Sequence, residues 1–155
     1  MTSQNSQGCV PFDDFERMMT GKPYVDRCCH VDAVDCWGLV VLFYRLCMNV
    51  NVHHDDSYST GGDFVTCFDN EVEFWRETTI PKVGDVVVAY RGSHPVHVAL
   101  WWGRDKILHA REKTAVKTDR LKTLEKLSTK LRFLTYAGYS HSEDARCSKR
   151  DGKCS

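Results

Sequence analysis

The sequence of 155 residues contains no apolar run of the roughly 18 residues that a membrane-spanning helix requires. Its first residues, MTSQNSQGCVPFDDF, lack the basic region and the apolar segment of a secretory signal. It shows no internal repeat and no interleaving of aromatic with basic residues, so it does not indicate a repeat architecture or nucleic-acid binding. We therefore expect neither a membrane span nor a nucleic-acid partner.

The net charge is zero, but the charges are unevenly distributed along the chain. Residues 1–81 carry 13 acidic and 5 basic side chains, a net charge of −8, and residues 82–155 carry 8 acidic and 16 basic side chains, a net charge of +8. Two complementary surfaces of one domain, or a contact with a neighbouring subunit, would explain this asymmetry. A basic face for an anionic polymer is the alternative.

The length and composition predict one globular domain with a substantial core, since 42% of the residues are hydrophobic and 27% are charged. We expect this domain to span residues 1–139, with residues 1–9 frayed. Residues 140–155, SHSEDARCSKRDGKCS, contain few apolar side chains and are expected to be a disordered tail.

Eight cysteines in a short chain raise the possibility of disulfides or a metal site. We expect mostly free thiols, because a secretory signal is lacking and Cys47 lies in an apolar helical run. The segment CCHVDAVDC, from Cys28 to Cys36, together with Cys67 or the tail cysteines, could hold zinc, but it lacks the usual C-x₂₋₄-C pair. The loop sequence His53-His54-Asp55-Asp56 could hold a cation, although a solvated loop is the simpler interpretation. No metal and no cofactor are expected.

Hydrophobic periodicity changes along the chain and predicts an α+β fold. Helices are predicted over 11–21, 35–48 and 64–79, with a loop at 49–64. The helix over 35–48 is apolar around almost its whole circumference, whereas the helix over 64–79 has apolar residues at three- and four-residue steps. Short runs with β-type patterns predict strands at 85–92, 96–103, 106–110, 115–121 and 132–139, with a helical turn at 121–130. N-terminal helices should therefore pack on an antiparallel meander of about five to six strands.

The stretch VDCWGLVVLFY, residues 34–44, places one cysteine at the start of a predicted buried helix. Asp35 is a preferred N-cap residue, so Cys36 should lie in the first helical turn, where the helix dipole favours a thiolate. The free amide groups there can also receive the oxyanion of a tetrahedral intermediate. Gly38 would let another chain segment or a substrate backbone approach closely. From this stretch alone, a buried core thiol remains the alternative.

Two histidines on predicted strands can supply a base for this thiol. His97 lies in PVHVALWWG, and His109 lies twelve residues later in KILHA, across a turn at WWGRD. If the two strands form a hairpin centred near residues 103–104, the two histidines lie close together and on the same side. Cys36, His97 and His109 can then converge on one site.

These segments together resemble the NlpC/P60 family of papain-like cysteine peptidases, especially members associated with phage tail tips. The resemblance rests on PYV, VDCWGLVVLFYRL, PKVGDVVVAY and HVALWWGRDKILHA, in this order over residues 21–139. The chain departs from the family pattern at Cys28 and Cys29, where a Gly-Gly pair is frequent, and at Ala99, where Gly is frequent.

The resemblance implies a papain-like fold in which Cys36 is the nucleophile, His97 the general base and His109 the residue that orients it. Tyr24 and Asp35 would lie at the substrate beside the nucleophile. The implied activity is hydrolysis of peptidoglycan stem peptides, with tail-tip proteins as partners. The protein would be made in the bacterial host cytoplasm, incorporated in the virion tail and act at the cell wall. A tail-tip assembly subunit with little hydrolysis, and an amidase or acyl transferase with the same triad, are alternatives.

Overall fold

The computed structural model describes residues 9–52 and 74–137. The described helices are α1 (Phe12–Met19), α2 (Cys36–Cys47) and α5 (Leu121–Leu127). The strands are β2 (Cys29–His30), β3 (Ala33–Val34), β4 (Trp75–Glu77), β5 (Val86–Arg91), β6 (His94–Gly103), β7 (Lys106–Ala110), β8 (Val116–Arg120) and β9 (Lys130–Tyr136). The predicted α+β class is confirmed.

Six strands form one antiparallel sheet in the order β4-β9-β5-β6-β7-β8. Strands β5 to β8 are the predicted meander, each paired with the next along the chain. After β8 the chain passes through α5 and returns to the other side of β5, where β9 pairs. The sequence predicted the strand β9 but not this return. The short strands β2 and β3 form a separate hairpin.

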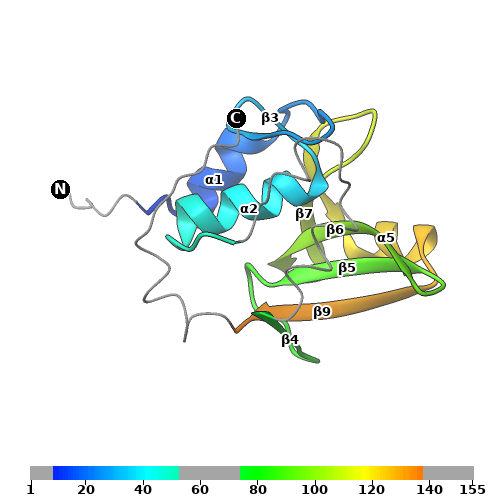
Figure 1. Cartoon of the computed structure of the whole chain (residues 1–155). Helices are drawn as coiled ribbons and strands as arrows, with labels where there is room; N and C mark the ends of the chain where they lie inside the picture. The colour runs from blue at the N-terminus through cyan, green and yellow to red at the C-terminus, as the bar shows by residue number, and fades with distance from the viewer. Residues whose placement is uncertain (1–8, 53–73, 138–155) are drawn as a thin grey trace.

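Both faces of the sheet are covered, which explains why β5 is apolar almost throughout. Helices α1 and α2 lie together on one face (Figure 1), and Val86 and Val88 of β5 pack in the core on that side. Val87 packs on the opposite face with Leu124 of α5. Successive side chains of a strand point to opposite faces, so a strand between two layers must be apolar at every position.

Helix α2 is the central buried helix that the sequence predicted. Its residues from Cys36 to Tyr44 are all buried, so the helix has no polar face. It is only 12 residues long, and none of the helices in residues 9–52 and 74–137 is long and apolar enough to cross a membrane.

The predicted helix over residues 64–79 is wrong where the structure describes that segment. Trp75–Glu77 form β4 and pair with β9, with Trp75 opposite Tyr136. The Trp75 ring lies 5.0 Å from the ring of Tyr136 and 5.4 Å from that of Tyr44, measured between centroids. This cross-strand aromatic packing outweighs the helical spacing of the apolar residues. Residues 64–73 lie outside the described residues.

Other features singled out from the sequence also lie outside the described residues. They are most of the loop at 49–64, its His53-His54-Asp55-Asp56 cluster, Cys67 and the tail 140–155.

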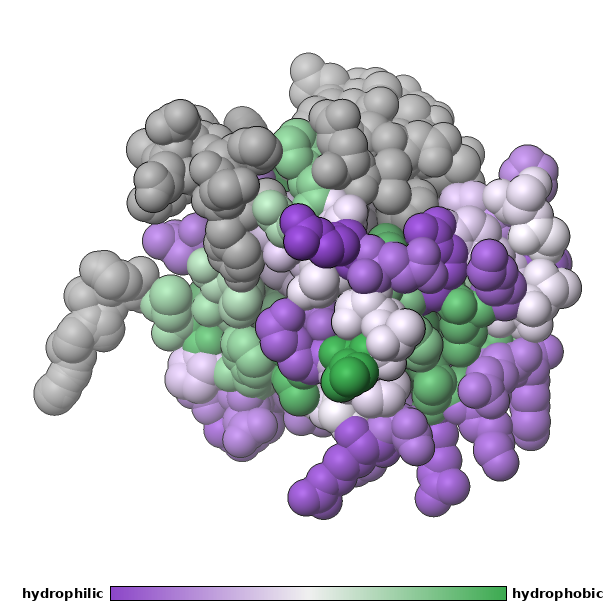
Figure 2. Space-filling model, turned by 90° about the horizontal axis from the view of Figure 1, so that it is seen from below, coloured by the Kyte–Doolittle hydropathy of each residue, from purple (hydrophilic) through white to green (hydrophobic). Residues whose placement is uncertain are grey.

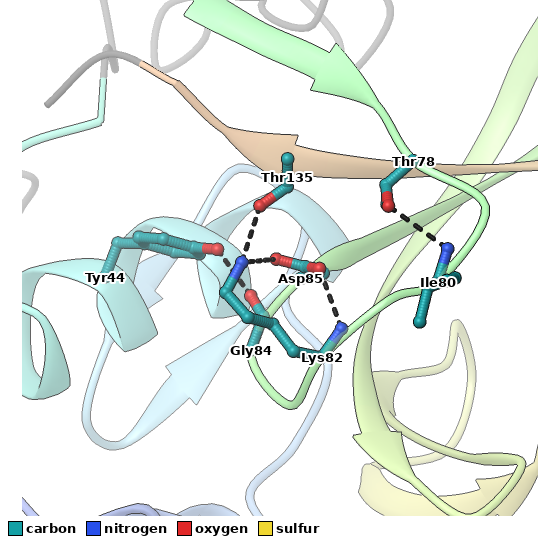
Figure 3. A network of polar contacts seen from close by, with 7 residues as sticks. All are labelled: Tyr44, Thr78, Ile80, Lys82, Gly84, Asp85 and Thr135. Atoms are coloured by element: carbon teal, nitrogen blue, oxygen red, sulfur yellow. Dashed lines mark hydrogen bonds and ion pairs between the residues drawn. The ribbon is translucent and has the colours of Figure 1, made fainter.

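The Gly84-Asp85 corner before β5 is held by a polar network that joins α2, β5 and β9 (Figure 3). Asp85 is 3% exposed, and its carboxylate accepts hydrogen bonds from the Lys82 backbone amide at 2.8 Å and from Lys82 Nζ at 3.2 Å. Lys82 Nζ also donates to Thr135 Oγ1 at 2.8 Å, and the Tyr44 hydroxyl donates to the Gly84 carbonyl. The network fixes the position of α2 relative to the sheet.

The surface seen from below is mostly hydrophilic, with hydrophobic residues in separate patches (Figure 2). The most exposed large hydrophobic side chain among the described residues is Ile80, which is 83% exposed. It lies in the loop before the Gly84-Asp85 corner, where its backbone amide donates to Thr78 Oγ1 at 3.1 Å (Figure 3). On the face drawn in Figure 2, the described residues therefore form no single broad apolar surface.

Candidate active site

The N-terminus of α2 is fixed by Asp35, which is the N-cap that the sequence predicted. Asp35 Oδ1 accepts a hydrogen bond from the Gly38 amide at 2.7 Å, and Oδ2 accepts one from the Arg27 amide at 2.9 Å. The residue is only 3% exposed. Asp35 thus ties the loop before β2 to the helix start, as a capping carboxylate does. Its predicted contact with substrate stays a prediction.

Gly38 is required for the close approach of the loop that precedes it in the chain. A Cβ atom at this position would lie 2.1 Å from the carbonyl oxygen of Cys28, which accepts a hydrogen bond from the Asp35 amide at 3.0 Å. The segment that Gly38 admits is therefore the protein's own loop. The left-handed backbone position in this loop is Arg27, with φ of 61°, so neither Cys28 nor Cys29 bears that strain.

The Cys36 thiol is buried at the start of α2, and its surroundings favour the protonated form. Burial is the main cause that raises the pKa of Cys36, and the charge of Asp35 raises it further. The backbone amides of Val98, Trp37 and Cys36 lie at the thiol and act in the opposite direction. The prediction of a thiolate at this helix start is therefore wrong for this conformation, because desolvation outweighs the helix N-terminus.

The two predicted histidines meet across the β6–β7 hairpin, which turns at Arg104 and Asp105. His97 Nε2 lies 2.9 Å from His109 Nδ1, and the two rings are inclined by 74°. Burial, followed by the neighbouring His109 and Arg111, lowers the pKa of His97 to about 3. His97 is therefore a neutral imidazole over the physiological pH range.

His109 makes a second contact, which sequence reasoning missed. Its Nε2 lies 2.7 Å from Asp119 Oδ2 on β8. His109 is 1% exposed, and burial lowers its pKa even though Asp119 acts in the opposite direction. A signal for Asp119 was present in the sequence: the pairing of β8 with β7 places Asp119 opposite Ile107, on the same face as His109.

The thiol and the first histidine are neighbours through the backbone of β6. The amide of Val98, the residue after His97, lies at the Cys36 thiol. Among the described residues no hydrogen bond joins the Cys36 thiol to the His97 ring, and the ring's only hydrogen bond is the one from Nε2 to His109. Catalytic hydrogen bonds are often long in structures without substrate and tighten when it binds.

Tyr24 lies at the same site. It is partly buried, and its backbone forms an isolated bridge with Val34, directly before Asp35. Burial is the main cause that raises the pKa of Tyr24, and the negative charge of Asp35 acts in the same direction. Its hydroxyl therefore keeps its proton and can donate a hydrogen bond beside the thiol.

Possible metal ligands in the described part of the chain do not form a cluster that could hold a metal ion. Residues 9–52 and 74–137 contain no group of three or more His, Cys, Asp or Glu side chains placed to hold a metal ion. Cys9, Cys36 and Cys47 in this part are free thiols. The residues that the structure does bring together are a thiol, a tyrosine hydroxyl and two hydrogen-bonded imidazoles, a set suited to nucleophilic acyl chemistry.

The comparisons with known families and proteins agree with this geometry. Residues 21–132 match the family model of the NlpC/P60 family. No curated protein is significantly similar to the chain in sequence.

Solved structures share the fold at low sequence identity. The NlpC/p60 domain of the peptidoglycan hydrolase SagA aligns with a TM-score of 0.55 and 17% identity, over 78% of this chain and 92% of that domain. An N-acetylmuramoyl-L-alanine amidase from Bacteroides uniformis aligns with a TM-score of 0.54 and 10% identity, over 79% of this chain and 97% of the amidase. An NlpC/P60 family protein from Bacillus cereus aligns with a TM-score of 0.53 and 20% identity, over 78% of this chain but only 38% of that protein. At these identities the similarity shows the fold alone.

Proposed function

Because the chain belongs to the NlpC/P60 family, we propose that it is a cysteine peptidase that hydrolyses the stem peptides of peptidoglycan. The observation that carries the proposal is the placement of Cys36 at the start of α2 against β6, whose His97 is hydrogen-bonded to His109. The name of the structural neighbour SagA, a peptidoglycan hydrolase, supports the choice of substrate.

In the proposed mechanism, a neutral thiol and a neutral imidazole react when substrate arrives. The thiol turns towards His97 Nδ1, and its proton moves to that nitrogen as Sγ forms a bond to the peptide carbonyl carbon. The backbone amides at the start of α2 donate hydrogen bonds to the resulting oxyanion. His97 then gives the proton to the leaving amine as the C–N bond breaks.

A water molecule completes the reaction on the thioester. His97 Nδ1 takes a proton from the water as its oxygen attacks the carbonyl carbon, and the C–S bond breaks. The proton returns to Sγ, so the products are a carboxylic acid and the original thiol. In this scheme His109 holds the His97 ring through the 2.9 Å contact.

The proposal extends to the setting of the enzyme. The sequence resemblance to tail-tip-associated members supports local opening of the cell wall from a phage tail, in contact with tail-tip proteins. Detection of the chain in purified phage particles by mass spectrometry would support this setting, and its absence from particles that infect normally would contradict it.

Two alternatives have specific support. An amidase or acyl transferase would use the same residues, and a named amidase shares the fold. A tail-tip subunit with little hydrolysis is favoured by the buried, protonated thiol, which makes no hydrogen bond to His97 among the described residues.

Mass spectrometry of muropeptides after incubation with purified peptidoglycan separates these functions. The wild-type chain is expected to release fragments cut within the stem peptide, and Cys36→Ala is expected to release none. Cys47→Ala is the matched control, because Cys47 is a buried thiol at the other end of α2 and should be dispensable for hydrolysis. Cleavage between sugar and peptide would indicate the amidase, and intact substrate with the wild-type chain would favour the structural subunit.

A further inference from the structure

The hydrogen-bonded chain that starts at His97 continues beyond His109 to Asp119 of β8. His97 Nε2 lies 2.9 Å from His109 Nδ1, and His109 Nε2 lies 2.7 Å from Asp119 Oδ2. We propose that Asp119 is a positioning residue, which fixes the tautomers of both histidines and so leaves the proton-accepting lone pair of His97 on Nδ1, the nitrogen that takes the thiol proton in the proposed mechanism. This inference rests on the proposed function of Cys36 and His97.

The tautomers of the two histidines follow from which atoms can donate a hydrogen bond. An ionised carboxylate only accepts hydrogen bonds, so His109 must carry its proton on Nε2. In a neutral imidazole the other nitrogen is then an acceptor, so His109 Nδ1 accepts a hydrogen bond. His97 must therefore carry its proton on Nε2, and its Nδ1 is left with the lone pair that a general base needs.

The surroundings keep each member of the chain in the required protonation state. Burial acts to raise the pKa of Asp119, but the hydrogen bond with His109 and the cations Lys117 and Arg111 lower it overall. Lys117 Nζ lies 3.7 Å from Asp119 Oδ1. The buried His109 stays neutral because burial lowers its pKa, and Arg111 and Lys117 act in the same direction. With Asp119 anionic and His109 neutral, the proton of His109 lies on Nε2 and its Nδ1 accepts from His97.

Asp119 is reached from outside through a basic pocket, and this gives the inference a sharp test. The side chain of Asp119 is 17% exposed, whereas that of His109 is fully buried. A cavity of about 470 Å³ lies against Asp119 and is lined by Arg111, Arg120, Lys122 and Lys126. A small carboxylate such as formate can enter this pocket, which attracts anions, and occupy the place of a deleted Asp119 side chain.

The test compares the rate of peptidoglycan hydrolysis by the wild-type chain, Asp119→Ala, Asp119→Asn and the control Glu125→Gln. Asp119→Ala is expected to lower kcat by about 10- to 100-fold with little change in KM. This is less than the ~10⁴-fold loss known where a carboxylate holds the catalytic histidine directly. Asp119→Asn should lose less, because its amide oxygen can still accept from His109. Glu125 is an exposed carboxylate of α5, and its replacement should leave the rate unchanged.

Formate distinguishes a positioning role from a merely structural one. Added formate should restore much of the activity of Asp119→Ala and leave the wild-type rate unchanged. Asp119→Ala that is as active as the wild type would overturn the inference while leaving the proposed function intact. A folded but slow Asp119→Ala that formate does not rescue would also overturn it.

A second measurement does not depend on catalysis. Nitrogen NMR shifts of the imidazole rings should show His97 and His109 both protonated on Nε2 in the wild-type chain, and a mixture of tautomers in Asp119→Ala. If the wild-type chain hydrolyses nothing, the proposed function fails, but the NMR result still decides the role of Asp119. A wild-type His97 protonated on Nδ1 would contradict that role.

Discussion

Two partly or fully buried carboxylates, Asp85 and Asp119, hold two polar networks that differ in what they join. Asp85 accepts hydrogen bonds from the amide and ammonium groups of Lys82, at the corner where α2 meets the sheet (Figure 3). Asp119 accepts a hydrogen bond from His109, which leads to His97 and the neighbourhood of Cys36. The first network ties side chains and backbone of neighbouring elements together, whereas the second connects groups that can exchange a proton.

This difference indicates a division of labour within one sheet. The Asp85 network lies before β5 and fixes the position of elements, so its loss should affect folding. The histidine network lies on β6, β7 and β8, and its loss should affect chemistry. Gly84 and Asp85 of the segment PKVGDVVVAY are thus explained by architecture, whereas the histidines are explained by the proposed reaction.

The largest expected effect is on catalysis. His97→Ala should reduce peptide hydrolysis by about 10²–10⁴-fold, because it removes the proposed general base. Its thermal unfolding should change little, since His97 is only partly buried and its ring makes a single hydrogen bond among the described residues. His94→Ala, at an exposed position of the same strand, is the matched control and should keep full activity. A His97→Ala chain that is folded and fully active would break the comparison.

The next effect is on stability. Asp85→Ala should lower the free energy of unfolding by about 1–2 kcal/mol, because it removes the acceptor of the Lys82 amide and ammonium groups at this corner. The specific activity of the folded fraction should stay close to that of the wild type. Asp85→Asn should cost less, since its amide oxygen can still accept from the Lys82 backbone. Urea denaturation gives the stability, and a normal midpoint for Asp85→Ala would show that the corner does not depend on this carboxylate.

The pH dependence of stability should separate the two networks further. The pKa of His97 is about 3 in the folded protein, below the ordinary value near 6.5 that it has when unfolded. Between these values the unfolded chain binds more protons, so the free energy of unfolding falls as pH decreases from about 6.5 towards 3. His97→Gln should flatten this decline in thermal melts, and His94→Gln should not. Equal slopes in both variants would be inconsistent with a His97 that stays neutral in the folded protein.

A smaller contrast concerns thiol reactivity. Cys36 should react with iodoacetamide at pH 6 more slowly than the exposed Cys9, because burial keeps its thiol protonated and shielded. Peptide mapping after short labelling times measures both rates in the same sample. Faster labelling of Cys36 would mean that the resting site contains a thiolate, and the neutral mechanism would have to be abandoned.

Local signals in the sequence were enough to predict the elements that carry the site. Asp35 as the N-cap, the apolar run after Cys36, and the hairpin that brings His97 to His109 all depend on residues close together in sequence. Each follows from capping preference, helical burial or strand alternation. The structure confirms the helix, the cap and the approach of the two histidines.

Features that depend on distant contacts could not be predicted in the same way. Trp75 belongs to β4 because it packs on Tyr44 and Tyr136, which lie far away in the sequence. The protonated state of Cys36 depends on how completely the rest of the fold covers it. The role of Asp119 follows from strand alternation only once β8 is paired with β7, which places Asp119 opposite Ile107 and on the same face as His109.

The central claim, that Cys36 is the nucleophile, is tested most directly by trapping its acyl intermediate. The wild-type chain is mixed with a stem-peptide substrate and quenched in acid at short times, and its peptides are analysed by mass spectrometry. The mechanism predicts a transient mass increase on the peptide containing Cys36, equal to the acyl part of the cleaved substrate. Product release without any adduct on Cys36, and at the same rate in Cys36→Ala, would contradict the claim.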